Sequence, residues 1–481
     1  MTKSFIKNKS AINMTVVGFG QAGSRIADNF ASYKDENGKS IYNCLALNSN
    51  DGDLKGLKHI QANNTASLEL GGLGKNPQKA MQILEENENA KEKLKDFITK
   101  QVRIEDDLVL FCAGLGGGTG TSTIVKAIEE FYDHYNKPLI TQILKKIIEK
   151  VSKEEYIKNK NHYNKQAVLL AEEKSVKIGI IATLPLRADG PDVLRQVNDF
   201  SQRIWKLAND RTKGISFVTF PDNQFFYDKL KQTPQNRIGD IDNYRDFANN
   251  EICSVLHEWN TATTGGGTEV TFDSQDFRRA VLEGNGCLVL NRNSKPMKEV
   301  SNGNVIKDML VSSIDGSSLH SPIEIVQKNE SGNIEYAKVH HLGLLAILDR
   351  NDGYGSSFID DARVEIVDNP EFAMTGSIFS GYLEGKNDHS VSVYSLYKTS
   401  GLPERLSKGL VNEFEEYQQK QKEIKFSQSN IEQIEIEDID DDIAFDIDLA
   451  ELGIEEEKTD TIKEKNKEFD LSDLDLSNIK F

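Results

Sequence analysis

The sequence predicts an α/β fold built on a parallel β-sheet, followed by a second, smaller α/β domain. Three Gly-rich segments predict the sheet, because each follows an apolar run and precedes a stretch with apolar residues at helical spacing. They are centred on Gly20, Gly74 and Gly117. Turns from strand to helix line one edge of a parallel sheet, so three of them can converge on one ligand.

The composition indicates a protein of two or three domains, since 481 residues can bury a substantial core. No run approaches the ~20 apolar residues of a membrane span. The polar N-terminus lacks the apolar segment of a signal peptide. The four cysteines have no metal-ligand spacing and are expected to be buried thiols in a reducing cytoplasm.

Charge is distributed unevenly along the chain. The net charge is −18, and residues 427–481 contribute −14 of it, with 19 acidic and 5 basic side chains. The body is therefore nearly neutral, which gives no indication of a nucleic-acid-binding surface. The acidic tail is expected to be disordered. It either keeps the protein soluble or contains a short amphipathic peptide that folds onto a partner.

The first Gly-rich segment, GFGQAGSRI, follows a predicted strand that begins at Met14. Its G-x-G-x-x-G pattern is, by itself, equally compatible with a dinucleotide site. A second apolar run, 44–47, ends at the carboxyl edge where parallel sheets bind ligands. The candidate ligand contacts from these two segments are Gly20, Gln21, Ala22, Asn48 and Asn50.

The third strand-to-helix turn, AGLGGGTGTSTI, gives the most specific pattern. Its glycines leave backbone amides free to wrap an anion at the N-terminus of a helix, whose dipole favours negative charge. It lacks the Lys of a Walker loop, so amides and hydroxyls must bind the phosphates; a mobile turn is the alternative. The predicted contacts are Gly114, Gly116, Gly117, Gly118, Thr119, Gly120 and Thr121, together with Gly74, Lys75 and Asn76 from the preceding segment LGGLGKNPQKAM.

These segments resemble, in order, the nucleotide loops of the tubulin/FtsZ superfamily. GGGTGT is similar to the signature GGGTGSG, with Ser122 in place of the last glycine, and GQAGSRI and KNPQ resemble two further loops. The resemblance covers about residues 11–425. It implies GTP or GDP as ligand, and Mg²⁺ held mainly by the GTP phosphates and water rather than by a protein metal site.

Residues 137–174 look like an insertion relative to that family. Apolar residues from Ile140 to Val151 fall on one helical stripe, and a Lys-rich stretch follows. One interpretation is a packed helix with a solvated return. The other is a basic contact surface for a partner, a neighbouring filament or the acidic tail.

Residues for the sugar and base are expected further along the chain. Asp189 precedes Gly-Pro, where FtsZ-like chains have Glu-Gly-Pro, and is expected to meet the ribose and phosphates. Tyr244, Phe247 and Asn249 begin a long amphipathic helix. An aromatic ring can stack on a purine, and a carboxamide can pair with guanine but would be left unpaired by adenine. The alternative is that the two aromatic residues pack in the core and the Asn caps the helix. The spacing of the three residues resembles the guanine-reading helix of the TubZ-type branch.

Asp273 and Asp276 are the predicted catalytic residues. Their spacing at a helix start lets them face one side, although the helix dipole alone also favours acids there. The segment resembles the loop that carries the catalytic acids of the superfamily, with Thr271 in place of an Asn. Because carboxylates would be repelled by their own subunit's triphosphate, they are expected to orient a water at the nucleotide of the next subunit.

The resemblance is strongest to the TubZ-type branch and implies a GTPase of the bacterial cytoplasm that assembles head to tail into dynamic filaments. Such proteins partition plasmid or phage DNA through a DNA-binding adaptor at a centromere-like site. Three alternatives stay open: an FtsZ-like or phage-positioning filament, a non-hydrolysing scaffold, against which the two acids argue, and a Rossmann-type NAD-dependent oxidoreductase with Asp51 on the ribose. The expected organisation is a GTP-binding domain (11–240), a central helix (241–265), a C-terminal domain (266–402), a C-terminal helix (403–426) and the tail (427–481).

Overall fold

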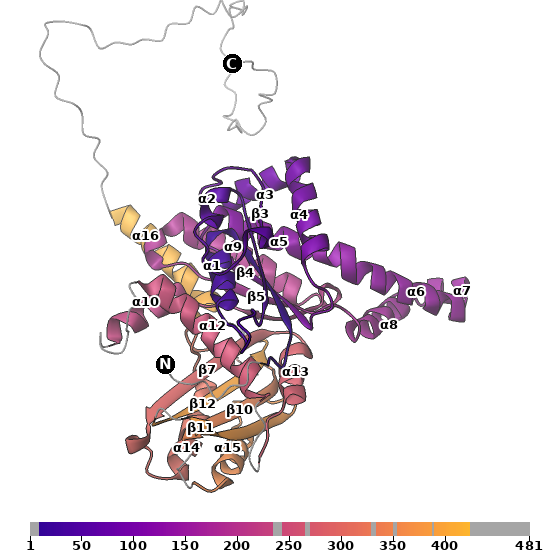
Figure 1. Ribbon diagram of the computed structural model, residues 1–481. Coiled ribbons are helices and arrows are strands. Elements are labelled where there is room, and N and C mark those ends of the chain that lie inside the picture. The colour runs from indigo at the N-terminus through magenta and orange to yellow at the C-terminus, as the bar shows by residue number, and fades with distance from the viewer. Residues whose placement is uncertain are drawn as a thin grey trace, which may run out of the picture. The chain divides into compact units, whose positions relative to one another are not determined.

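The computed structural model describes residues 9–233, 243–264, 270–328, 333–349, 354–386 and 389–423. All of them belong to one unit, residues 1–423, in which two halves share a β-sheet (Figure 1). The predicted acidic tail lies outside the described residues, as do the predicted domain boundaries at residues 240 and 265.

In the described chain, ten strands form this sheet in the order β11–β10–β12–β7–β6–β5–β4–β1–β2–β3. The strands from β7 to β3 are parallel, which confirms the predicted parallel sheet, whereas β12 is antiparallel to both β7 and β10. The strands are β1 (Met14–Phe19), β2 (Asn43–Asn48), β3 (Thr65–Ser67), β4 (Leu108–Gly114), β5 (Ile178–Thr183), β6 (Ile215–Thr219), β7 (Cys287–Pro296), β10 (Val339–Asp349), β11 (Ile378–Lys386) and β12 (Ser390–Thr399); β8 (Val326–Lys328) and β9 (Ile334–Tyr336) pair separately.

Alternating apolar residues let helices cover both faces of the parallel half. In β1, Val16 belongs to the core beneath α1 and α12, and Val17 to the core beneath α5 and α9, because successive side chains point to opposite faces. The helices of this half are α1 (Gly20–Ala31), α2 (Asp51–Leu54), α3 (Pro77–Glu86), α4 (Glu88–Gln101), α5 (Gly118–Phe131), α9 (Pro191–Ala208), α10 (Asn223–Gln232) and α12 (Tyr244–Ala262), with short 3₁₀ turns η1 (Ala62–Asn64), η3 (Arg187–Asp189) and η4 (Arg211–Lys213).

The predicted smaller C-terminal half is built on β7, β10, β11 and β12. The sheet continues into it through a single residue pair between β6 and β7, Val218 with Cys287. Helix α12 runs between the halves (Figure 1), and its buried Trp259 packs against Phe277 and Tyr394, with ring centroids 6.0 and 6.1 Å away. The other elements of this half are α13 (Ser274–Leu282), α14 (Gly303–Ser312), α15 (Ser357–Asp368), η5 (Met297–Glu299) and η6 (Ser313–Asp315).

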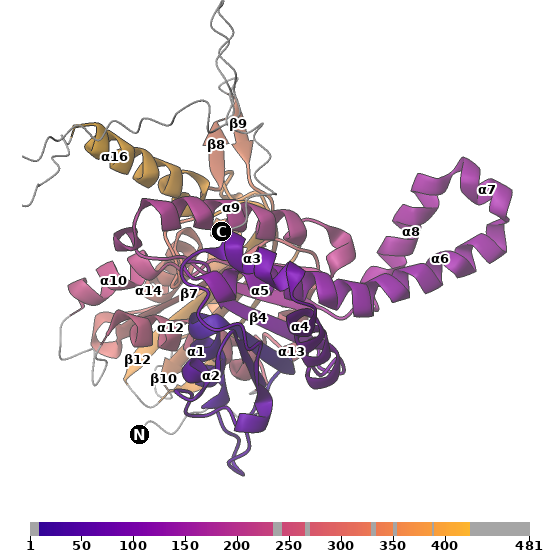
Figure 2. The same ribbon diagram turned by 90° about the horizontal axis from the view of Figure 1, so that it is seen from above.

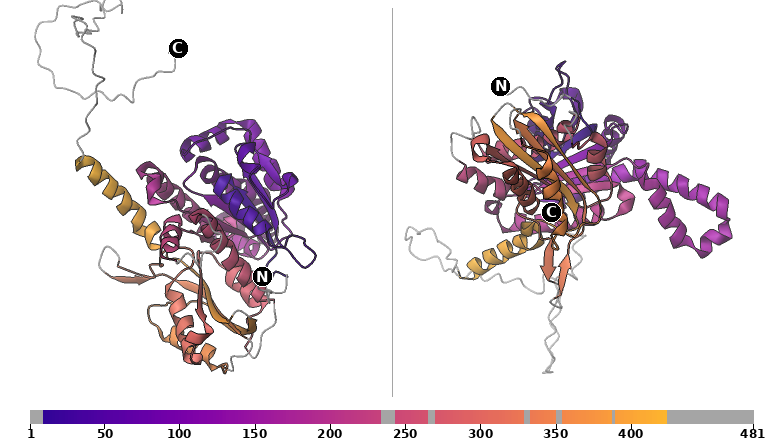
Figure 3. Two further views of the ribbon diagram at one scale, coloured as in Figure 1. Left: turned by 60° about the vertical axis from the view of Figure 1, so that its left-hand side comes forward. Right: turned by 90° about the horizontal axis from the view of Figure 1, so that it is seen from below.

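The predicted insertion folds as a helical arm that extends away from the sheet (Figure 2). A π turn, η2 (Tyr132–Asn136), leads from α5 into the arm, where α6 packs against α8. The right-hand view of Figure 3 shows the C-terminal helix on the side of the body opposite to this arm. The arm contains α6 (Lys137–Val151), α7 (Lys153–Lys158) and α8 (Lys160–Glu172), and the C-terminal helix consists of a π turn, η7 (Arg405–Gly409), and α16 (Leu410–Glu423). No described helix is long and apolar enough to cross a membrane.

Candidate functional site

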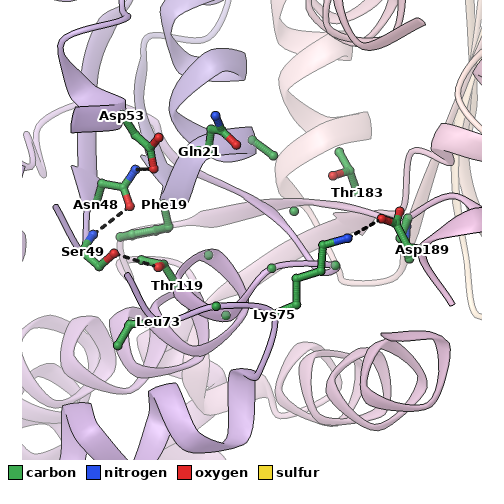
Figure 4. Close-up of a pocket in the computed structure, with 18 of the residues that line it drawn as sticks. Phe19, Gln21, Asn48, Ser49, Asp53, Leu73, Lys75, Thr119, Thr183 and Asp189 are labelled. Atoms are coloured by element: carbon green, nitrogen blue, oxygen red, sulfur yellow. Dashed lines mark hydrogen bonds and ion pairs between the residues drawn. The ribbon is translucent and has the colours of Figure 1, made fainter. Parts of the chain in front are cut away.

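The three Gly-rich turns meet around a cavity of about 390 Å³ at the carboxyl ends of the parallel strands (Figure 4). They come from the ends of β1 and β4 and from the segment before α3. Much of the lining consists of main chain and small side chains, as expected for a site where amides surround an anion.

Direct backbone contacts hold the turns together. The Gly118 amide donates to the Gly74 carbonyl at 3.0 Å, and a Cβ at Gly118 would collide with that same oxygen. Gly20 has φ +65°, and a Cβ there would lie 2.7 Å from the Gly120 nitrogen. Both positions therefore require glycine, one for close approach and one also for its left-handed backbone.

Hydroxyl groups stabilise the third turn from within. Thr121 donates to the carbonyls of Gly117 at 2.6 Å and Gly114 at 3.2 Å, so it supports the turn rather than lining the cavity. Ser122 is fully buried and donates to the Gly118 carbonyl at 2.9 Å. This replacement of the family glycine is therefore accommodated inside α5, away from the rim.

The end of β2 and the residues after it supply polar side chains to the cavity lining, next to the Gly-rich turns (Figure 4). Asn48 accepts a bond from the Ser49 amide and donates to Asp53 at 3.0 Å, and Ser49 accepts from Thr119 at 3.0 Å. Asn50 lines the cavity while its carboxamide oxygen caps α2. These bonds fix the side chains before any ligand binds, which reduces the entropy lost on binding.

Lys75 and Asp189 face each other across the cavity. Their ion pair measures 2.7 Å and joins the second turn to the segment after β5, with Lys75 61% and Asp189 30% exposed. Asp189 also accepts a bond from the Leu186 amide. The neighbouring Asn76 does not line the cavity, because its side chain caps α3 through the Lys79 amide.

Only one of the three predicted base-binding residues lines the cavity. Tyr244 does so, and its ring meets Tyr227 edge-on at 5.8 Å. Phe247 packs instead against Phe226 in the core, at 6.1 Å, and Asn249 is half-buried away from the lining. The sequence interpretation missed Asn223 and Arg245, which line the cavity from the first turns of α10 and α12. Their proximity depends on tertiary packing; only the Asp-Asn turn could have indicated Asn223.

The predicted acids lie at the opposite edge of the sheet. Asp273 is exposed and accepts bonds from the amides of Gln275 and Asp276, at 2.8 and 2.9 Å, so it caps α13. Burial and, secondarily, the Asp273 carboxylate raise the pKa of Asp276. Arg278 of the same helix binds Asp107, which immediately precedes β4. Helix α13 is therefore fixed at the amino ends of the parallel strands.

In total, the cavity brings together most of the predicted ligand residues. Those lining it are Gln21, Ala22, Asn48, Asn50, Gly74, Lys75, Gly114, Gly116, Gly117, Gly118, Thr119, Gly120, Asp189 and Tyr244; those outside the lining are Gly20, Asn76, Thr121, Phe247, Asn249, Asp273 and Asp276. Among the described residues, no group of three His, Cys, Asp or Glu side chains could hold a metal ion.

Known proteins share this sequence pattern and fold. Residues 13–172 match the GTPase domain of the Tubulin/FtsZ family. The tubulin-like protein TubZ of Bacillus cereus is 23% identical over 425 residues, covering 86% of this chain and 85% of that one.

Two solved structures are similar along most of the chain. GDP-form protofilaments of TubZ from Bacillus thuringiensis serovar israelensis give a TM-score of 0.62 at 18% identity, covering 88% of this chain and 94% of that one. A structure described as type III plasmid segregation TubZ gives 0.56 at 18% identity, covering 88% and 97%. Residues 13–172 therefore form a GTPase domain of the Tubulin/FtsZ family, and the chain as a whole has the tubulin/FtsZ fold.

Proposed function

We propose that the cavity binds GTP or GDP, and that GTP is hydrolysed where a second copy of the chain supplies Asp273 and Asp276. The observation that carries this proposal is the separation of the two sites within one chain. Gly114 ends β4 at the cavity, whereas Asp107 precedes β4 and binds the helix that follows the acids. Seven residues at ~3.3 Å each place about 20 Å of strand between these points.

A carboxylate so far from the cavity cannot orient a water on a nucleotide in its own chain, because that requires a separation of one hydrogen bond or one bridging water. Stacking copies head to tail would bring the carboxyl edge of one sheet to the amino edge of the next. This arrangement explains why each chain can carry both half-sites, and it makes hydrolysis depend on assembly.

In the proposed complex, the amides at the N-terminus of α5 bind the phosphates, supported by the helix dipole. Lys75, which lines the cavity, places a positive charge near the phosphates. Mg²⁺ is held by the phosphates and water. Tyr244 stacks on the base. Since Asn249 does not line the cavity, we assign the pairing with guanine to the carboxamide of Asn223.

Asp276 is the proposed group that orients the attacking water. Its carboxylate accepts a hydrogen bond from the Asp273 main chain and keeps further acceptor capacity, whereas one oxygen of Asp273 accepts two amide bonds that cap α13. Asp273 therefore holds the loop in shape and adds negative charge. In phosphoryl transfer most of the catalysis comes from positioning and electrostatics, so a correctly placed acid is sufficient for this role.

We further propose that the filament partitions plasmid or phage DNA in the bacterial cytoplasm, through a DNA-binding adaptor at a centromere-like site. Support comes from the similar protein that is described as plasmid segregation TubZ. A plasmid carrying the gene with its flanking DNA should be retained by dividing cells, and should be lost at the random rate when the gene carries Asp276→Asn. Equal retention would exclude this role but not the GTPase.

The decisive test is phosphate release from GTP and from ATP, measured against protein concentration with light scattering on the same samples. We expect GTP-selective release to begin at the concentration where scattering begins. Release that rises linearly from the lowest concentration would mean a self-contained active site and would exclude the shared one.

A further inference from the structure

We propose that Arg405 and Glu413 form a latch that couples the docking of α16 to nucleotide binding, so that GDP or GTP in the cavity tightens α16 on the body. This inference rests on the proposed nucleotide site and adds a regulatory element to it. Among the residues that line the cavity none belongs to η7 or α16, so the coupling has to pass through the cavity wall.

Arg405 binds two segments of that wall from the side away from the cavity. Its guanidinium donates to the Pro185 carbonyl at 2.7 Å and to Asp222 at 2.5 Å. Pro185 lines the cavity and packs close to the Gly116 turn, and Asp222 directly precedes Asn223, which also lines it. One side chain therefore fixes two separate segments of the lining.

The same guanidinium binds α16, the part of the C-terminal helix that follows η7. Its Nε and Nη2 atoms donate to the two carboxylate oxygens of Glu413, at 3.0 Å each. Arg405 and Asp222 are 7% and 4% exposed at their side chains, and Glu413 is 10% exposed. Water cannot replace these bonds in so buried a cluster, so a displaced α16 would leave the arginine partly unpaired.

A second set of contacts links α16 to the segment that ends at Asp189. Arg187 pairs with Glu416 at 2.8 Å, and the Tyr417 hydroxyl donates to the Arg187 carbonyl at 2.9 Å. Asp189, two residues further on, lines the cavity and pairs with Lys75. The wall between Pro185 and Asp189 is thus held on one face by α16 and presents its other face to the cavity.

Coupling of this kind is reciprocal: a ligand that fixes the wall must strengthen α16 docking by the same factor that α16 docking strengthens the ligand. Hydrogen exchange on the full-length wild-type chain, at concentrations below the onset of scattering, should therefore show slower exchange in residues 410–423 when GDP is added. Unchanged exchange with GDP bound would overturn the inference without any variant.

Two variants provide the reverse measurement. Glu413→Gln leaves Arg405 paired with Asp222 and should weaken GDP binding by about five-fold or more while speeding exchange in α16. Lys408→Met is the matched control, because Lys408 lies in the same π turn and its described ion pair is with Glu324, at 3.1 Å, which does not line the cavity. It should leave GDP affinity unchanged.

A Glu413→Gln variant with faster α16 exchange but wild-type GDP affinity would refute the latch. A wild-type protein that binds neither GDP nor GTP would instead refute the nucleotide site itself.

Discussion

The guanidinium of Arg278 binds both carboxylate oxygens of Asp107, at 2.6 Å each. This pair joins α13, the helix that begins at the two acids, to the residue that immediately precedes β4, the central strand of the GTPase domain. The far end of the same helix is also fixed: Lys398 is fully buried and donates to the carbonyls of Val281 and Glu283. Helix α13 is therefore fixed at both ends, as its proposed role in positioning the two acids requires.

Arg278→Met should reduce GTP turnover more than it reduces stability. Losing a bidentate pair that is 29% and 21% exposed should cost about 1–2 kcal/mol in unfolding free energy. The release of α13 should lower GTP turnover about ten-fold or more, since small misplacements of catalytic groups cost much rate. Arg279→Met is the neighbouring control, because its i,i+4 pair with Glu283 is about half exposed. Equal effects of both variants on phosphate release would contradict this role.

Asp276→Asn should abolish most GTP turnover while leaving GDP affinity and folding intact. The Asp276 carboxylate accepts a hydrogen bond from the Asp273 main chain, and the side-chain oxygen of Asn can accept the same bond, so the substitution should cost little unfolding free energy. Asp273 needs a different substitution: Asp273→Asn keeps a side-chain acceptor for the cap, whereas Asp273→Ala should lose about 1 kcal/mol of stability as well. Phosphate release, nucleotide affinity and urea unfolding measured on all three variants separate the two effects. Full turnover by Asp276→Asn would exclude it from catalysis.

The Gly-rich turns could be predicted from the sequence because each stands between an apolar run and a stretch with apolar residues at helical spacing. The contacts that require glycine at Gly20 and Gly118 are made to other turns, at Gly120 and Gly74, and only the structure shows them. The predicted strand starting at Met14 and the helix after the third turn appear as β1 and α5. Residues 137–174, interpreted from the sequence as an insertion, fold as an arm separate from the sheet (Figure 2), which the sequence did not predict.

What depends on long-range packing could not be predicted. Asn223 and Arg245 come to the cavity only because α10 and α12 pack together, and no spacing in the sequence reports that contact. Phe247 has the spacing of a base-binding residue but turns into the core against Phe226. The predicted second domain shares the sheet with the first, because β6 pairs with β7 at a register that only folding sets.

Gly118→Ala should abolish nucleotide binding with little unfolding. The added methyl collides with the Gly74 carbonyl oxygen, so the second and third turns must separate. Main-chain atoms cannot move aside as a flexible side chain would. Gly355→Ala, outside the cavity lining, has no atom within 4 Å of the new Cβ and is the control. Fluorescent GDP titration, with thermal unfolding of each variant, tests the difference.

The same variant allows a complementation test of the shared site. Gly118→Ala retains the acidic loop and Asp276→Asn retains the cavity, so each is inactive alone. Mixing them should restore GTP turnover, since an Asp276→Asn cavity can meet a Gly118→Ala acid. A mixture that stays inactive although the two chains co-sediment would place all catalytic groups in one chain.

Acid should destabilise the fold between about pH 6.5 and pH 4. Burial lowers the pKa of His257 and of His320 to about 4, from 6.5 in the unfolded chain. Across this interval the unfolded state binds more protons than the folded state, so the unfolding free energy falls as pH falls, by at most about 3 kcal/mol per histidine. The Tyr42 hydroxyl lies 2.9 Å from Nδ1 of His257, and a neutral imidazole can accept a hydrogen bond from it there.

Urea unfolding of the wild-type chain at several pH values measures this slope. His257→Gln removes one of the two titrations and should flatten the dependence. An unfolding free energy that stays constant between pH 6.5 and 4.5 in the wild type would show that both rings are protonated in the folded state.

Replacing residues 145–165 by a short Gly-Ser linker should leave GDP affinity unchanged and change the unfolding free energy by less than about 1 kcal/mol. In the arm, α6 packs mainly against α8, and Ile157 and Leu170 are 65% and 52% exposed, so the shortened arm removes little of the shared core. The lysines between Lys145 and Lys165 make no described ion pair, so their removal breaks none.

The concentration at which scattering begins then separates the two interpretations of the insertion. An unchanged threshold fits a solvated helical hairpin, whereas a raised threshold with intact GDP binding makes the arm a contact surface between assembling chains. Loss of GDP binding would contradict the prediction, because it would mean that the arm supports the GTPase domain itself.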